Sequence, residues 1–149
     1  MNNFNVGDLS GLISLFNAAK DHLKYPKIRL LAPSGQVVVL SVAGGKSQYP
    51  GTILVVDEGR YPDNKYFGRL FPDGRWSAGR AATTEVLDLL RRLAADPATV
   101  AAEYGKLTGN CCFCRKALSD ERSTAVGYGS TCAEHFNLPW GAVIHQQAA

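Results

Sequence analysis

A short run of cysteines in the last third of the chain limits the folds that this sequence can adopt. Cys111 and Cys114 are separated by two residues, as are Cys132 and His135, and seventeen residues lie between the two pairs. Each pair can chelate a metal from one tight turn, and the intervening loop can bring the pairs together around one tetrahedral zinc ion. The spacing therefore predicts a Zn²⁺ site whose ligands are Cys111, Cys114, Cys132 and His135.

The residues around the second pair predict a short helix. Ser130 or Thr131 can cap it, and Cys132 and His135, three positions apart, then lie on one helical face. We expect a treble-clef-like zinc module over residues 109–141. Such a module typically contains a knuckle, a hairpin and a helix whose first turn supplies metal ligands. With four protein ligands available, the expected site is closed and structural rather than catalytic.

Other interpretations of the cysteines agree less well with the sequence. A redox CxxC pair follows a strand inside a βαβ pattern, and no such pattern precedes Cys111. The chain opens without a signal-peptide pattern, and the adjacent Cys111 and Cys112 would make an awkward disulfide framework, so we expect a reducing, cytoplasmic environment. The two-residue spacing favours Cys111 as the ligand and leaves Cys112 as a buried thiol or an alternative ligand.

The cysteine region also resembles a known pattern. The segments G-N-C-C-F-C from Gly109, A-L-S-D-E-R-S from Ala117 and G-Y-G-S-T-C ending at Cys132 are similar to a small zinc-knuckle module of uncharacterised phage and bacterial proteins. That pattern is G-x-C-x-x-C-G-x-x-L-T-D-x-x-S followed by G-x-G-P-x-C. In several of those proteins a D-P-x6-Y-G phrase comes before the module, and Asp96-Pro97 and Tyr104-Gly105 match it here.

The resemblance covers roughly residues 65–135 and departs at two positions. Arg115 replaces the glycine that follows the knuckle, and Ser130 replaces the proline before the third cysteine. The shared pattern fixes three cysteines, so His135 as fourth ligand is an inference from spacing. The resemblance implies no particular activity, because the family is uncharacterised. Its members occur beside helicase-like regions, and this association alone implies a role with nucleic acid.

The rest of the chain predicts an α+β fold. Residues 1–7 are expected to be a frayed lead-in, and apolar residues from Leu9 to Leu23 recur at helical spacing. Strands are expected at 27–32, 36–43, 52–57, 65–71 and 75–78, and further helices from Thr83 or Thr84 to Asp96 and from Pro97 to Tyr104, ended by Gly105. We expect an antiparallel sheet covered on one face by helices in a domain over 1–108, with the zinc module docked on it and a disordered tail at 142–149.

The hairpin around Pro72-Asp73-Gly74 is a candidate binding surface. Arg69, Arg75 and Arg80 occur here among several aromatic residues. Arginines can contact phosphates and aromatic rings can stack on bases, a combination typical of single-stranded nucleic-acid binding. We predict that the three arginines gather at one site with Trp76 or Tyr66 as the stacking surface, and that Lys116 contributes from the zinc module. Strict alternation would place Phe67, Arg69 and Phe71 on one face of the hairpin.

The sequence offers little support for catalysis. Gly44-Gly45-Lys46-Ser47 ends like a phosphate-binding loop, but Leu40 stands where the motif needs its first glycine. No nucleophile elbow and no paired carboxylates in an apolar setting occur, so we expect a protein that is not an enzyme.

Two functions fit these observations. The first is a nucleic-acid-associated accessory protein of phage or bacterial origin, which the net charge of +3 permits. The second is an adaptor or inhibitor that binds a host or partner protein through the same surface or through the first helix. Asp120 and Glu121 interrupt the basic residues of the zinc module and count against DNA. No membrane contact is expected, and the sequence identifies no small-molecule substrate.

Overall fold

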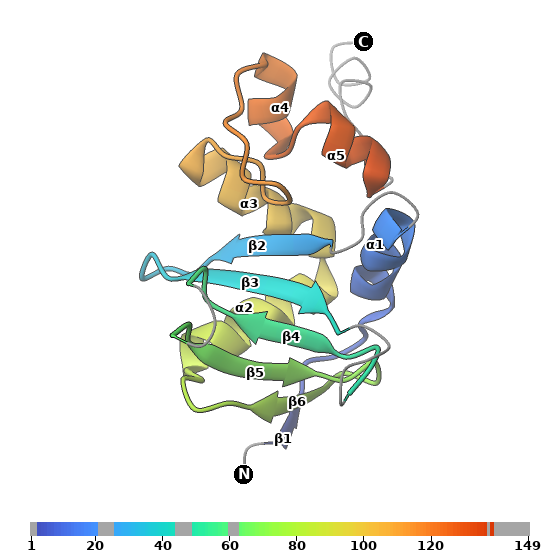
Figure 1. Ribbon diagram of the computed structural model, residues 1–149, viewed down its shortest axis with the longest axis vertical. Coiled ribbons are helices and arrows are strands. Elements are labelled where there is room, and N and C mark those ends of the chain that lie inside the picture. The colour runs from blue at the N-terminus through green and yellow to red at the C-terminus, as the bar shows by residue number, and fades with distance from the viewer. Residues whose placement is uncertain (1–2, 21–25, 44–48, 60–62, 137, 139–149) are drawn as a thin grey trace.

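Six antiparallel strands form the centre of the protein. The computed structural model describes residues 3–20, 26–43, 49–59, 63–136 and 138, and its sheet has the strand order β1-β6-β5-β4-β3-β2 (Figure 1). The strands are β1 (Asn3–Asn5), β2 (Lys27–Leu31), β3 (Val37–Val42), β4 (Ile53–Val56), β5 (Tyr66–Leu70) and β6 (Arg75–Ala78). The helices are α1 (Ser10–Lys20), α2 (Thr84–Ala95), α3 (Pro97–Thr108), α4 (Glu121–Val126) and α5 (Ser130–His135). The α+β class and the antiparallel sheet predicted from the sequence are confirmed.

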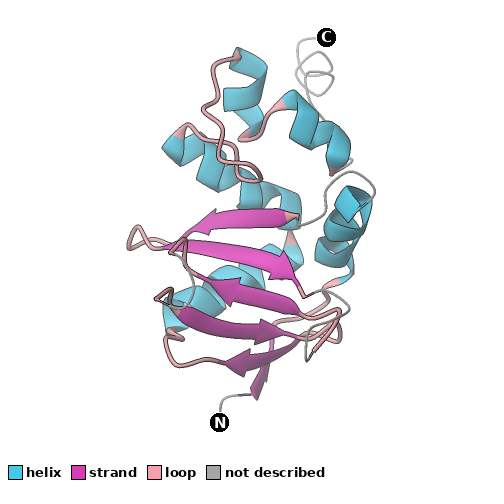
Figure 2. Cartoon of the chain, viewed as in Figure 1, coloured by secondary structure: helices cyan, strands magenta, loops and turns pink. Residues whose placement is uncertain are grey.

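Helices α2 and α3 lie against one face of the sheet, and α1 packs against α2 at the side of the sheet (Figure 2). Alternate strand residues point toward them, because successive side chains of a strand face opposite ways. Ile28, Leu30, Val38 and Leu40 are fully buried in this way and join one hydrophobic cluster with the helices. Val39 points to the other face and is only 7% exposed, so the centre of β3 is buried on both faces, whereas Val37 and Ser41 beside it are half-buried. None of the described helices is long and apolar enough to span a membrane.

The N-terminal residues are not a frayed lead-in. Asn3, Phe4 and Asn5 pair with Ser77, Trp76 and Arg75 of β6, and the Val6 amide donates to the Gly74 carbonyl oxygen at 2.9 Å. The free edge of β6 offers unpaired backbone groups that the first residues of the chain satisfy. Three residues are too few to show a hydrophobic period, so this strand could not be predicted from the sequence.

Helix α3 continues beyond Gly105, where the sequence predicted its end, and stops at Gly109 in a left-handed C-cap. Gly105 is buried, and a Cβ atom there would overlap the carbonyl group of Gly127. Gly127 in turn follows α4, a helix that the sequence analysis missed. The glycine of the Tyr104-Gly105 phrase therefore permits close backbone packing between α3 and the cysteine region instead of ending the helix.

The cysteine region lies along β2, the strand at one edge of the sheet (Figure 1). The Arg29 amide donates to the Cys112 carbonyl oxygen at 2.7 Å, and the Arg29 guanidinium donates to the Phe113 carbonyl oxygen. Phe113 stacks on Phe136 with ring centroids 3.9 Å apart, and both rings belong to the main hydrophobic cluster. The cysteine region thus shares the core of the sheet domain. The predicted tail at 142–149 lies outside the described residues.

Candidate metal centre

A narrow hairpin presents the first two cysteines. The Cys111 amide donates to the Lys116 carbonyl oxygen at 2.8 Å, and the Leu118 amide donates to the Gly109 carbonyl oxygen at 2.8 Å. Between these bonds the chain turns tightly, and the Arg115 amide donates to the Cys111 carbonyl oxygen at 2.9 Å. This turn places the Cys111 and Cys114 side chains on the same side of the loop, as a chelating knuckle requires.

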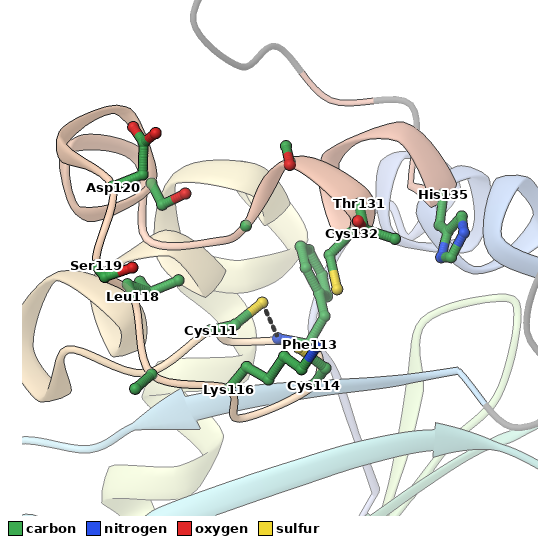
Figure 3. Close-up of a pocket in the computed structure, with 14 residues that line it drawn as sticks. Cys111, Phe113, Cys114, Lys116, Leu118, Ser119, Asp120, Thr131, Cys132 and His135 are labelled. Carbon is green, nitrogen blue, oxygen red and sulfur yellow. Dashed lines mark hydrogen bonds between the residues drawn. The ribbon is translucent and has the colours of Figure 1, made fainter.

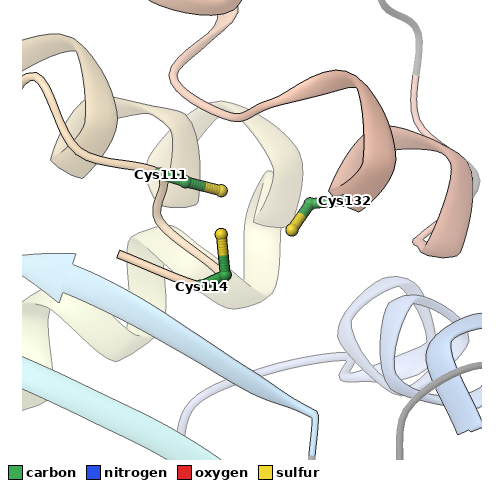
Figure 4. A group of neighbouring side chains, drawn as sticks. All are labelled: Cys111, Cys114 and Cys132. Carbon is green, nitrogen blue, oxygen red and sulfur yellow. The ribbon is translucent and has the colours of Figure 1, made fainter. Parts of the chain in front are cut away.

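Helix α5 supplies the third cysteine from its first turn. The sulfur atoms of Cys111, Cys114 and Cys132 all lie within 4.8 Å of one another, and Figure 4 shows them converging on one point. Cys111 and Cys132 are buried, whereas Cys114 is exposed. Three converging thiols at this separation can hold one thiophilic metal ion. The metal-binding part of the sequence prediction is therefore supported for these three residues.

The environment of Cys111 favours the thiolate form that a metal needs. The pKa of Cys111 is lowered to about 5, chiefly by the hydrogen bond with the Cys132 thiol and further by the backbone amides of Cys114, Gly129 and Phe113. The same shared proton raises the pKa of Cys132, with burial as the second cause. Of the two thiols, Cys111 is therefore the one whose thiolate the surrounding hydrogen bonds stabilise. A bound cation would replace the shared proton and deprotonate both thiols.

His135, the predicted fourth ligand, does not lie in this group. Among the described residues, only the three cysteines bring their ligand atoms within 4.8 Å of one another. In Figure 3 the His135 ring lies beyond Cys132 along α5, on the side away from Cys111. The helix that carries the second pair forms as predicted, but its N-cap is Gly129 rather than Ser130 or Thr131.

Of the two adjacent cysteines, Cys111 brings its sulfur into the converging group and Cys112 does not. Cys112 is fully buried in the hydrophobic cluster and does not belong to the group of converging sulfurs. Burial raises the pKa of the Cys112 thiol, which keeps it neutral. Cys111 is therefore the metal-binding candidate of the adjacent pair, and Cys112 is a core residue.

Arg115 has a backbone conformation that normally requires glycine. Its φ angle is 66°, and it is the sole residue other than glycine with positive φ in the described part of the chain. Glycine adopts such angles without steric cost. This explains the glycine at the corresponding position of the pattern that the cysteine region resembles.

We expect Arg115→Gly to stabilise the protein by about 0.5–1 kcal/mol, because the relief of left-handed strain slightly exceeds the entropic cost of glycine. Urea unfolding of the two proteins measures this difference. Lys116→Gly is the matched control, since Lys116 has no positive φ, and it should destabilise by a similar amount. An Arg115→Gly protein less stable than the parent would contradict the assignment of strain.

One comparison with known proteins gives a match. Residues 101–137 match the model of a family of unknown function, DUF6011. The matched segment begins in α3 and ends just after α5, so it contains all three converging cysteines together with Gly105 and Gly127. No curated protein and no solved structure matches the chain.

The predicted arginine site is only partly assembled. Arg69 and Arg75 lie beside two aromatic rings: the Arg69 guanidinium carbon is 5.1 Å from the Tyr49 ring centroid, and that of Arg75 is 4.5 Å from the Phe71 ring centroid. The two rings meet edge to face with centroids 6.3 Å apart. We call Tyr49, Arg69, Phe71 and Arg75 the arginine–aromatic cluster. Tyr49 went unrecognised in the sequence because it is distant from the hairpin along the chain.

The other residues predicted for this surface lie elsewhere. Trp76 is 2% exposed and packs in the core over Gly68, so it is not a stacking surface and that prediction is wrong. Tyr66 is 37% exposed, but its ring lies against Gly79 near the opposite end of the hairpin. Arg75 is the first residue of β6, whereas Arg80 lies beyond the last residue of that strand, in the turn that follows Gly79. Lys116 is exposed at the knuckle, on a separate part of the molecule.

The hairpin also breaks the strict alternation that the sequence predicted. Phe67 is buried in the core, although Arg69, two positions later, is only half-buried. Gly68 between them has φ of 152°, and the pairing of β4 with β5 shifts at Val55/Val56. The irregular backbone turns Phe67 toward the helices and leaves Arg69 on the open face.

Proposed function

We propose that this protein is a zinc-stabilised, non-enzymatic module that binds single-stranded nucleic acid through the arginine–aromatic cluster. The three converging thiolates support zinc, because cysteine sulfur is its usual ligand in structural sites. The resemblance to phage and bacterial modules supports an accessory role beside nucleic-acid enzymes. The observation that carries the nucleic-acid proposal is the pairing of each arginine with an aromatic ring on the sheet face that no described helix covers.

The cluster combines the two contacts that single strands need. Tyr49 is 46% exposed, so a base can reach it from solution and stack beside the Arg69 guanidinium. Arg69 is held in place because its guanidinium donates to the Thr52 hydroxyl at 2.7 Å, and Thr52 is buried. A fixed guanidinium loses less entropy when it binds phosphate than a free one.

Arg75 has a competing partner, which sets a limit on the affinity. Its Nε lies 2.9 Å from the Asp73 carboxylate in an exposed ion pair. Exposed pairs of this kind contribute at most about 1 kcal/mol, so a phosphate can replace Asp73 at small cost. The cluster then has the positive charges of Arg69 and Arg75 and the negative charge of Asp73. This small excess of positive charge favours weak phosphate binding that decreases as the salt concentration rises.

We expect Arg75→Ala to weaken the binding of a labelled single-stranded oligothymidine and to lower the magnitude of its salt slope by about 0.7, the value for one lost phosphate contact. Fluorescence anisotropy at several salt concentrations measures both quantities. Arg80→Ala is the matched control, since it removes the same charge outside the cluster and should leave the slope nearly unchanged. Tyr49→Ala should weaken binding without changing the slope, because it removes stacking alone.

Equal effects of Arg75→Ala and Arg80→Ala would show unspecific attraction and would contradict a site at the cluster. Binding that is absent in the parent protein at low salt would reject nucleic acid altogether. The adaptor function predicted as the alternative would then take its place, with the same cluster as the surface for a protein ligand.

A further inference from the structure

The positively charged residues of the sheet all lie on its open face, the one that the helices do not cover (Figure 2). Among the six described strands, none contains an aspartate or a glutamate. Each cationic strand residue is next to buried core residues, and alternation turns its side chain away from the helices. These cations are Lys27, Arg29, Arg69 and Arg75. The open face therefore attracts anions over a wider area than the arginine–aromatic cluster alone.

The strand register places Lys27 in line with Arg69. In a row that crosses the sheet, each residue pairs with the next: Lys27 of β2, Ser41 of β3, Leu54 of β4 and Arg69 of β5 (Figure 1). Residues paired across strands have their side chains on the same face. The row extends over three strand spacings, so its two cations are separated by about 14 Å at their Cα atoms. We call these four residues the transverse row.

The middle of the transverse row is accessible and partly apolar. Lys27 is exposed, and Ser41 and Leu54 are half-buried, so solvent reaches the row along its length. Val39 and Val56 pair with each other on the same face beside it. Apolar side chains between two cations suit a ligand that has charges at intervals along a backbone and flat groups between them. A single-stranded nucleic acid has this character, because its phosphates alternate with bases whose faces stack on apolar surfaces.

The charged groups beside the row have other contacts. The Arg29 guanidinium donates to the Phe113 carbonyl oxygen, so it is held at the cysteine loop. The Asp57 carboxylate lies beyond the last residue of β4, where it accepts the Gly59 amide at 2.9 Å. Lys27 is therefore the cation of β2 that can follow a ligand on the open face, since its side chain is long and exposed.

We propose that a single-stranded nucleic acid crosses the sheet along the transverse row, from the arginine–aromatic cluster to Lys27, and that Lys27 contacts one of its phosphates. This inference rests on the proposed function and extends it, because it gives the bound strand a path and a longer site. The bases between the two ends lie on Leu54 and the valines beside it. Only an unpaired strand can place its bases there, since the bases of a duplex stay stacked inside it.

Oligothymidines of two lengths test the path on the full-length protein. A 5′-phosphorylated thymidine dinucleotide has one phosphate for each arginine of the cluster, whereas a strand of about eight nucleotides also reaches Lys27. We expect Lys27→Ala to lower the magnitude of the longer strand's salt slope by about 0.7 and to leave that of the dinucleotide unchanged. NMR titration at several salt concentrations measures both slopes. Lys106→Ala is the matched control, since it removes the same charge from an exposed position on α3 and should change neither slope.

A second pair of variants tests the middle of the path. Ser41→Glu puts a carboxylate in the transverse row opposite Lys27, where it repels phosphate and pairs with the lysine. We expect this variant to lose most of the affinity that the longer strand has over the dinucleotide. Ser41→Gln has nearly the same size without the charge, so it should retain that affinity.

Three results would overturn the inference. Equal salt slopes of Lys27→Ala and Lys106→Ala for the longer strand, with Arg75→Ala still lowering the slope, would reject the path and leave the cluster as the nucleic-acid site. A parent protein that binds neither oligothymidine at low salt would reject both the path and the proposed function. A polyglutamate peptide that binds as tightly as the longer strand, with the same loss in Lys27→Ala, would identify the partner as an acidic protein segment.

Discussion

We expect Cys114→Ala to lose its metal and to unfold the segment from Gly109 to Phe136. Zinc contributes on the order of 10 kcal/mol to the folding of small cysteine sites, which is comparable to the whole stability of a domain. Cys114 is exposed, so its replacement removes a ligand without opening a cavity in the core. Elemental analysis should give about one zinc per parent chain and far less for the variant. Hydrogen exchange should show lost amide protection from Gly109 onward.

Cys112→Ala is the control for this experiment. Cys112 is buried among apolar side chains and lies outside the group of converging sulfurs, so the variant should keep its zinc. It should lose about 1–2 kcal/mol of stability from the small cavity that the missing sulfur leaves. Full zinc in Cys114→Ala with loss of zinc in Cys112→Ala would reverse the assignment of the ligands.

The second large effect is expected at Gly105. Helix propensity alone predicts that Gly105→Ala stabilises α3 by about 1 kcal/mol. The structure predicts the opposite, because the new Cβ would overlap the Gly127 carbonyl group and force α3 away from the cysteine region. Forced displacement of packed backbone costs about 3 kcal/mol or more, so we expect a net loss of about 2 kcal/mol and a fall in melting temperature of about 5 °C.

Gly129→Ala is the matched control for the backbone contact. A Cβ at Gly129 meets no atom within 4 Å, so this substitution should change the stability by less than about 1 kcal/mol. A Gly105→Ala protein as stable as the parent would show that α3 and the Gly127 turn can separate at little cost. Scanning calorimetry of the three proteins decides between these outcomes.

The elements with a sustained hydrophobic period were predictable from the sequence. The strands from Lys27 to Ala78 and helix α2 lie within one or two residues of their predicted bounds, since each has a clear apolar face and a turn or cap at its ends. The six-residue α4 was missed because only Ser123 of its residues is buried, which leaves too little apolar patterning to detect. The available sign of this helix was Asp120, a residue type that favours the N-cap position. Its side chain caps α4 by accepting a hydrogen bond from the Arg122 amide.

The candidate sites were predictable to different degrees. The spacing identified Cys111, Cys114 and Cys132. A CxxC turn fixes the directions of its two cysteine side chains, and the first turn of a helix fixes the direction of the third. The spacing could not place His135, since a fourth ligand depends on the angle at which α5 packs. The arginine–aromatic cluster depends on contacts between Tyr49 and residues of the hairpin about twenty positions later. Local periodicity carries no information about such a contact.

The hydrogen bond from Arg29 to the cysteine loop has a consequence for solubility. β2 is the outermost strand on its side of the sheet, and the Cys112 carbonyl oxygen accepts one of its free amides. The opposite edge is protected differently, since β1 is only three residues long. When the metal is lost and the loop detaches, the five residues of β2 become an exposed template for strand pairing between molecules. Metal-starved cells should therefore accumulate this protein as aggregates, and chelator-induced turbidity should grow with protein concentration.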